Sequence, residues 1–204
     1  MSDGAPVGAG QRLLAALSYT YLLAMMTVIA AIVAAAMTMQ YLYGELPCPL
    51  CLLQRAALFG VCFGIMLTFR HGYSPQNTGI SLLFAILLLI VAERQTLLDI
   101  YPRPGHAYVG SAVFGLHMPV WSVIIALVLL ITIAAKLAIV GGDRELEHVH
   151  IRSFPFLARI GTVVSLFVIL LCLINLVSVI LQCGLNECHT FGYQLLGGPT
   201  SASE

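Results

Sequence analysis

The chain has 204 residues, of which 60% are hydrophobic and only 9% are charged. A soluble domain carries about 25% charged residues, so this composition cannot cover a water-facing surface. The formal net charge is zero, which argues against nucleic acid as a partner. The composition therefore predicts an all-α integral membrane protein, with lipid as its main solvent.

Five segments are long and apolar enough to cross a membrane as helices. A spanning helix needs about 20 mostly apolar residues, and charges near its ends can reach the headgroups. The first segment is too long for a signal-peptide core, so we expect it to be retained. In chain order the segments are 13–39, 52–69, 78–98, 120–140 and 160–181.

Lysine and arginine are distributed unevenly between the two sides that these segments define. With the N-terminus in the cytoplasm, only Arg103 falls in an external loop. Because cytoplasmic loops carry the excess of positive charge, the bias predicts a cytoplasmic N-terminus and an external C-terminus. The residues at the cytoplasmic ends are Arg12, Arg70, Lys136, Arg144, Arg152 and Arg159.

Four of the six cysteines form two close pairs on the predicted outer side. Cys48 and Cys51 lie between the first two spans, and Cys183 and Cys188 follow the fifth. The outer face of a bacterial membrane permits disulfides, whereas the cytosol does not. The placement of the pairs therefore indicates thiol–disulfide chemistry outside the cytoplasm.

The first pair, Cys48-Pro-Leu-Cys51, has the spacing of a small disulfide ring that can be reduced and re-formed. Cys51 lies where the second helix begins, and the N-terminus of a helix favours a thiolate. Arg55 follows one turn later on the same face. A guanidinium there stabilises the thiolate and can polarise a carbonyl oxygen of an acceptor. The alternative is a static disulfide, with Arg55 reaching to the headgroups.

The stretch Cys48-Pro-Leu-Cys51-Leu-Leu-Gln54-Arg55 resembles the C-x-x-C-x-x-x-R segment of the disulfide bond formation protein B (DsbB) family. The likeness continues over about 41–140, the four-helix core of that family. It is carried by three further stretches, Ala56-Ala-Leu-Phe-Gly60, Gln95-Thr-Leu-Leu-Asp-Ile-Tyr-Pro102 and Gly115-Leu-His-Met-Pro-Val-Trp121.

The resemblance implies a quinone-linked oxidase in the bacterial inner membrane. Such proteins reoxidise a periplasmic thioredoxin-like dithiol oxidase (DsbA) and pass two electrons to ubiquinone or menaquinone. Cys48 and Cys51 would be the quinone-coupled pair, and Arg55 would be the arginine of the quinone site. Gln95 stands where some members carry a histidine near the quinone, and its amide can still hydrogen-bond a quinone oxygen.

The chain departs from the family pattern in its second cysteine pair. That pair usually lies between helices three and four, but here the segment 99–118 contains no cysteine. The fifth helix and its tail are additional. The expected organisation is a cytoplasmic N-terminus (1–12), a four-helix core (13–140), a cytoplasmic loop (141–159), a fifth helix (160–182) and an external tail (183–204).

The tail motif Cys183-Gly-Leu-Asn-Glu-Cys188-His189 has three interpretations. The first, which the topology favours, is a displaced second redox pair. The second is a structural disulfide that holds the tail. The third is haem attachment with His189 as axial ligand, although the usual spacing for that is C-x-x-C-H.

The remaining candidates are weaker. Glu93 approaches the outer interface and could contribute to a quinone pocket. The loop 143–152 contains two histidines, but a solvated loop is the simpler interpretation than a metal site, so we expect no metal. Cys62 and Cys172 lie inside spans, where a free cysteine packs as a small hydrophobe.

The sequence thus predicts an enzyme in which Cys48, Cys51, Cys183 and Cys188 are catalytic and Arg55, Gln95 and Glu93 bind quinone. Two alternatives remain open. One is a quinone-linked thiol enzyme that serves a dedicated client or works in the reductive direction. The other is a non-enzymatic membrane subunit whose disulfides only stiffen its external loops.

Overall fold

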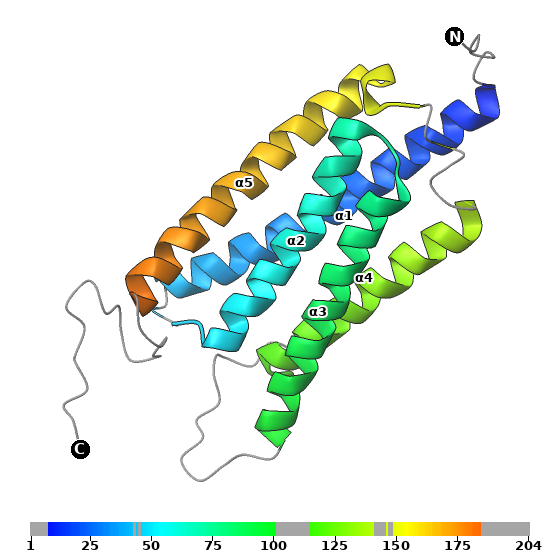
Figure 1. Ribbon diagram of the computed structural model, residues 1–204. Coiled ribbons are helices and arrows are strands. Elements are labelled where there is room, and N and C mark those ends of the chain that lie inside the picture. Colours follow the sequence, from blue (N-terminus) through cyan, green and yellow to red (C-terminus); the bar gives the residue numbers. More distant parts are fainter. Residues whose placement is uncertain are drawn as a thin grey trace, which may run out of the picture.

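The computed structural model describes residues 8–42, 44, 46–100, 115–140, 146 and 149–184. Within these residues the chain forms long helices that run antiparallel to one another (Figure 1). A short 3-10 turn, η2 (Ile151–Ser153), precedes the last helix. The helices are α1 (Ala9–Leu42), α2 (Pro49–His71), α3 (Pro75–Ile100), α4 (Met118–Val140) and α5 (Pro155–Cys183).

All five predicted spans are confirmed, since the five helices are each long and apolar enough to cross a membrane. Prolines mark where several of them begin, because proline is preorganised for the first helical turn and needs no donor there; Pro49 and Pro155 are examples. α2 and α5 end at Gly72 and Gly184, which have φ of 90° and 58°. Glycine adopts such angles without strain.

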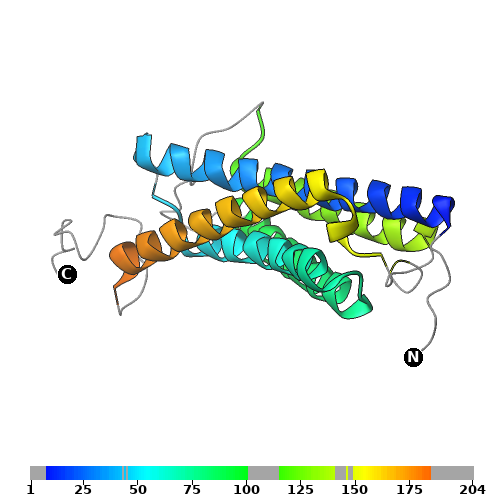
Figure 2. The same cartoon turned by 90° about the horizontal axis from the view of Figure 1, so that it is seen from above.

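The central helix of the bundle is α2, which packs against α1, α3 and α5. α4 covers the far side of α3, and α5 lies along α1 and α2 on the opposite flank (Figures 1 and 2). The fifth helix is therefore packed into the bundle beside the C-x-x-C helix. Residues on the inner face of its C-terminal half, such as Asn175 and Gln182, reach the end of α2 that carries the cysteines.

Two glycines let α2 and α3 approach closely. A Cβ on Gly60 would collide with the ring of Phe84, and one on Gly64 would lie 2.8 Å from the backbone of Asn77 and Ser81. Small residues four apart permit such contact between membrane helices. The contact sets a fixed spacing between the two helices that carry the cysteine pair and Gln95.

The two ends of the bundle carry different chemistry. The cysteine end contains Cys48, Cys51 and the last turn of α5, which meet where Gln182 donates to the Pro47 carbonyl at 2.9 Å. At the opposite end, the hydroxyl of buried Tyr19 donates to the Val149 carbonyl at 2.9 Å. Cys183 therefore lies at the same end as the first cysteine pair, as the sequence predicts.

Candidate functional site

The C-x-x-C motif forms the first turn of α2. Cys48 is the N-cap residue, with extended backbone angles, and its sulfur accepts a hydrogen bond from the Cys51 N–H at 3.1 Å. Pro49 occupies the first helical position. The cap thus places one sulfur over the free N–H groups that open the helix, and both thiols are free.

Gln95 of α3 lies beside both sulfurs. Its Nε2 atom is 3.4 Å from the Sγ of Cys48 and 3.4 Å from that of Cys51, and its Oε1 atom is 3.9 Å from the Cys51 sulfur. The side chain is only 5% exposed. A single amide can therefore donate to either sulfur of the pair.

A chain of hydrogen bonds holds that amide in place. Gln54 Nε2 donates to Gln95 Oε1 at 2.8 Å, and the Ser122 hydroxyl of α4 donates to Gln54 Oε1 at 2.8 Å. With its oxygen engaged by Gln54, the amide of Gln95 is oriented with its NH₂ group toward the sulfurs. Side chains from α2, α3 and α4 thus fix one orientation of the Gln95 amide.

Arg55 is buried one turn after Cys51, with 8% of its surface exposed. Its NH1 atom donates to Gln40 Oε1 at 2.6 Å and to Asn175 Oδ1 at 3.4 Å. Its NH2 atom donates to the Ala36 carbonyl at 3.2 Å. These three acceptors are neutral oxygens that hold the plane of the guanidinium in place.

Helix α5 contributes directly to this end of the bundle. Asn175 binds Arg55, Ser178 shares a short hydrogen bond with the Tyr41 hydroxyl, and Gln182 binds the Pro47 carbonyl just before Cys48. Gln182 is fully buried. Cys183, the next residue, is disulfide-bonded. The additional helix therefore brings an oxidised cysteine next to the loop that carries the first pair.

The two thiols of the first pair differ in environment. Cys48 is 8% exposed, whereas Cys51 is more accessible. A hydrogen bond from the Cys48 side chain to Cys51, together with burial, raises the pKa of the Cys48 thiol. The Cys48 thiol is therefore the weaker acid of the two. This favours Cys51 as the sulfur that reacts as thiolate.

The structure brings Cys48, Cys51, Arg55 and Gln95 together, but not every predicted residue. The Glu93 side chain is exposed and forms no hydrogen bond or ion pair in the described part of the chain. Its role at a quinone site stays a prediction. Cys188, the expected partner of Cys183, lies outside the described residues.

The two cysteines inside the spans differ from each other. Cys62 is fully buried in the core, as expected. Cys172 is exposed on α5, so the expectation that it packs in the interior is wrong. Its neighbours Leu173 and Leu176 are also exposed, and this side of α5 is one that lipid would cover.

Sequence reasoning missed the polar residues that surround the cysteines. Four of them are buried and Ser122 is half-buried, all in helices that are otherwise apolar, and polar side chains in that setting tend to face the bundle interior and to be functional. That rule applied to the spans would have found them. They are Gln40, Gln54, Ser122, Asn175 and Gln182.

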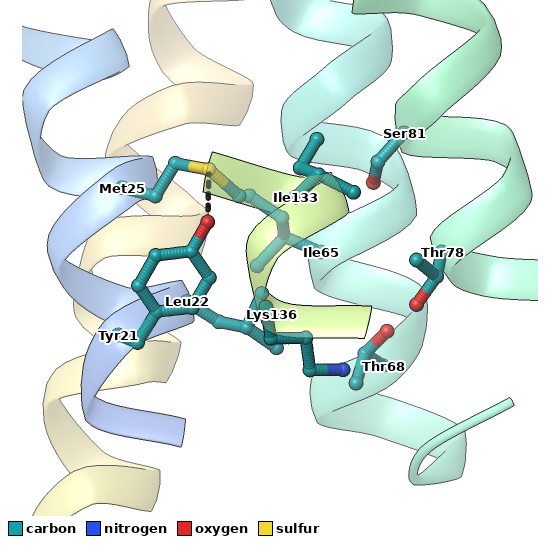
Figure 3. A pocket seen from close by; sticks show the side chains of 9 residues that line it. All are labelled: Tyr21, Leu22, Met25, Ile65, Thr68, Thr78, Ser81, Ile133 and Lys136. Atoms are coloured by element: carbon teal, nitrogen blue, oxygen red, sulfur yellow. Dashed lines mark hydrogen bonds between the residues drawn. The ribbon is translucent and has the colours of Figure 1, made fainter. Parts of the chain in front are cut away.

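A small cavity lies deeper in the bundle, where α1, α2, α3 and α4 meet (Figure 3). Tyr21, Thr68, Thr78 and Lys136 give it polar groups, and the Tyr21 hydroxyl donates to the Met25 sulfur at 3.5 Å. Its volume is about 10 Å³, enough for one water molecule. It is too small for a quinone ring.

Comparison with known proteins agrees with this site. Residues 18–107 match the model of the family described as "Disulfide bond formation protein DsbB". The Disulfide bond formation protein B of Cupriavidus metallidurans is 29% identical over 149 residues, which are 59% of this chain and 92% of that protein. No solved structure matches.

The resemblance to the DsbB family is thus confirmed, and it supports a membrane protein of disulfide bond formation. The family match includes the C-x-x-C helix and Gln95 and ends before α4. The contacts made by α5 therefore lie beyond the matched region.

Proposed function

We propose that this protein is a thiol–disulfide oxidoreductase that reoxidises a periplasmic DsbA-like dithiol oxidase and passes the electrons to membrane quinone. The observation that carries the proposal is the cluster of Cys48, Cys51, Gln95 and Arg55 at one end of an apolar bundle. The chain lies in the bacterial inner membrane with this end toward the periplasm. The excess of arginine and lysine at the other end supports that orientation.

The residues near Cys51 fit a quinone. A bound quinone supplies an acceptor for two electrons and two protons. Charge that develops on a quinone oxygen is stabilised by a buried cation and by oriented donors. Arg55, buried one helical turn after Cys51, provides the cation, and the Gln95 amide beside both sulfurs provides a donor. Leu53, 43% exposed on α2, gives an apolar approach from lipid.

Electrons enter through the tail pair. A thiolate of the partner attacks the Cys183–Cys188 disulfide and forms a mixed disulfide; the second partner thiol then displaces it. The partner leaves oxidised, and Cys183 and Cys188 become thiols. These reduce the Cys48–Cys51 disulfide by the same exchange. Cys48 and Cys51 then lose two electrons and two protons to quinone, which restores their disulfide.

The hydrogen bond from Gln182 to Pro47 supports this order of transfer. It holds the end of α5 against the residue that precedes Cys48, although Gln182 and Pro47 are 135 positions apart in the chain. Cys183, which follows Gln182, therefore lies near the first pair. Thiol–disulfide exchange requires direct contact of sulfurs. The position of Cys183 at this end supports exchange between the tail pair and the first pair.

The test uses the purified protein, a reduced thioredoxin-like partner and a soluble quinone, with quinone absorbance as readout. Replacing Cys183 and Cys188 by serine should stop electron flow from the partner. Small dithiols that reach Cys48–Cys51 directly should still reduce quinone. Cys51→Ser should abolish both reactions.

The matched control replaces Cys62 and Cys172 by serine and should turn over normally. If the tail variant oxidises its partner at the normal rate, the tail disulfide is structural and the first pair works alone. Full turnover in Cys51→Ser would overturn the proposed function itself.

A further inference from the structure

An open pocket of about 480 Å³ lies between α2 and α5, at the end of the bundle opposite to the cysteines. Its apolar wall includes Met66 and Leu166, and three arginines line it as well, namely Arg70, Arg152 and Arg159. The pocket thus combines an apolar wall with a cationic group. This combination matches a ligand that has an apolar tail and an anionic headgroup.

The three arginines come from three different elements. Arg70 is in the last turn of α2, Arg152 is in η2, and Arg159 is in the first turns of α5. All three side chains are exposed. Within the part of the chain that the structure describes, none of them forms a hydrogen bond or an ion pair. Their donors are therefore not used by contacts within that part of the chain.

The backbone that carries Arg152 is fixed to the bundle. Tyr19 of α1 binds the Val149 carbonyl, and its ring lies 6.4 Å from that of Phe154 and 6.3 Å from that of Phe69, measured between centroids. These contacts bracket the 3-10 turn. The position of Arg152 at the pocket is thus set by the packing at this end.

The flank of the pocket faces lipid. On α5, Phe156 and Val163 lie on the same face as Arg159, and they are 74% and 62% exposed. In a membrane-spanning helix such residues contact acyl chains. Arg159 therefore stands among lipid-facing residues near the helix end, at the depth of the headgroups.

We propose that this pocket binds the phosphate of an anionic phospholipid. Guanidinium groups match the geometry of phosphate oxygens and bind them in pairs of parallel hydrogen bonds. Basic pockets between membrane helices on the cytoplasmic side take such headgroups. The phosphate lies among the three arginines, and the acyl chains follow the wall formed by Met66 and Leu166. The site is remote from the cysteines and does not depend on the redox function.

The experiment measures binding of phosphatidylglycerol with a fluorescent acyl chain to the full-length protein in non-ionic detergent. Phosphatidylcholine with the same chains and inorganic phosphate serve as comparison ligands. A basic residue near an anionic headgroup contributes about fivefold in affinity. Replacing Arg70, Arg152 and Arg159 together by glutamine should therefore weaken phosphatidylglycerol binding about 100-fold.

The matched control is Arg12→Gln, which removes one exposed arginine from the same end of the bundle and should leave the affinity unchanged. If the triple variant does not fold, Arg159→Gln alone should weaken binding about fivefold. A triple Arg→Lys variant keeps the charge and should bind between the wild type and the glutamine variant.

Three results would overturn the proposal. One is equal affinity for phosphatidylglycerol and phosphatidylcholine, which would mean that only acyl chains are recognised. Another is a folded triple glutamine variant that binds like the Arg12 control. The third is complete displacement of the lipid by low millimolar inorganic phosphate, which would identify a site for a free anion.

Discussion

Arginine occurs at both ends of this bundle, in opposite circumstances. Arg55, at the cysteine end, is 8% exposed and held by oxygens from α1 and α5. Arg70, Arg152 and Arg159, at the other end, are exposed around an open pocket. A buried guanidinium is costly unless its donors are satisfied, so Arg55 is a fixed part of the site. The exposed arginines remain available to a ligand.

The largest expected effect concerns which end faces the periplasm. Single cysteines at Ser153 and at Ser203, each in a cysteine-free background, should respond oppositely to a membrane-impermeant maleimide. Because the arginine end is expected in the cytoplasm, only the Ser203 position should react in intact cells. Ser203 lies outside the described residues, but the label reports only its side of the membrane. Labelling at Ser153 without permeabilisation would reverse the orientation and place the cysteine pair in a reducing compartment.

The second effect tests whether Arg55 acts through its geometry as well as its charge. Arg55→Lys keeps the charge but loses the planar set of donors that binds Gln40 and Asn175. Losing a well-placed charged hydrogen bond costs about 1.5–3 kcal/mol, so the quinone KM should rise roughly 10- to 150-fold. The Cys48–Cys51 disulfide should still form.

Arg70→Gln is the matched control for that change and should leave the quinone KM unaltered. An unchanged KM in Arg55→Lys would mean that Arg55 has no part in quinone binding.

The smallest effect isolates the contribution of the additional helix. Asn175→Ala removes the 3.4 Å contact to Arg55 and keeps the other two acceptors. A typical hydrogen bond contributes about 0.5–1.5 kcal/mol, so the quinone KM should rise roughly 2- to 13-fold with little change in kcat. Thr162→Ala, a change on the same helix at an exposed position, is the control. If Asn175→Ala lowers kcat and leaves KM alone, α5 does not act through Arg55.

The sequence predicts the elements better than their ends. Apolar runs locate all five helices, but each helix extends beyond its run at one end or both; α5 begins at Pro155 rather than at 160. Helices continue into the interface, where polar residues are tolerated. Hydropathy alone does not locate these helix ends, whereas the positions of proline and glycine can indicate them.

The candidate site likewise contains residues that the sequence predicts and residues that it does not. Cys48, Cys51 and Arg55 are close in sequence, so helical spacing alone brings them together. Gln40 and Asn175 reach Arg55 across 15 and 120 residues, and no local pattern encodes such pairings. Glu93, two positions from Gln95, lies on a different face of the helix, and its role at a quinone site stays a prediction.

The glycine contact between α2 and α3 also has a consequence for the redox pair. Gly64 lies 13 positions after Cys51, which is roughly 20 Å along a helix. The backbone contact at Gly64 is the point about which α2 and α3 can tilt relative to each other. A side chain inserted there would rotate α3 against α2 and displace Gln95 from the sulfurs at the far end. The reactivity of the Cys48–Cys51 pair at the membrane surface thus depends in part on a glycine, Gly64, deep in the bilayer.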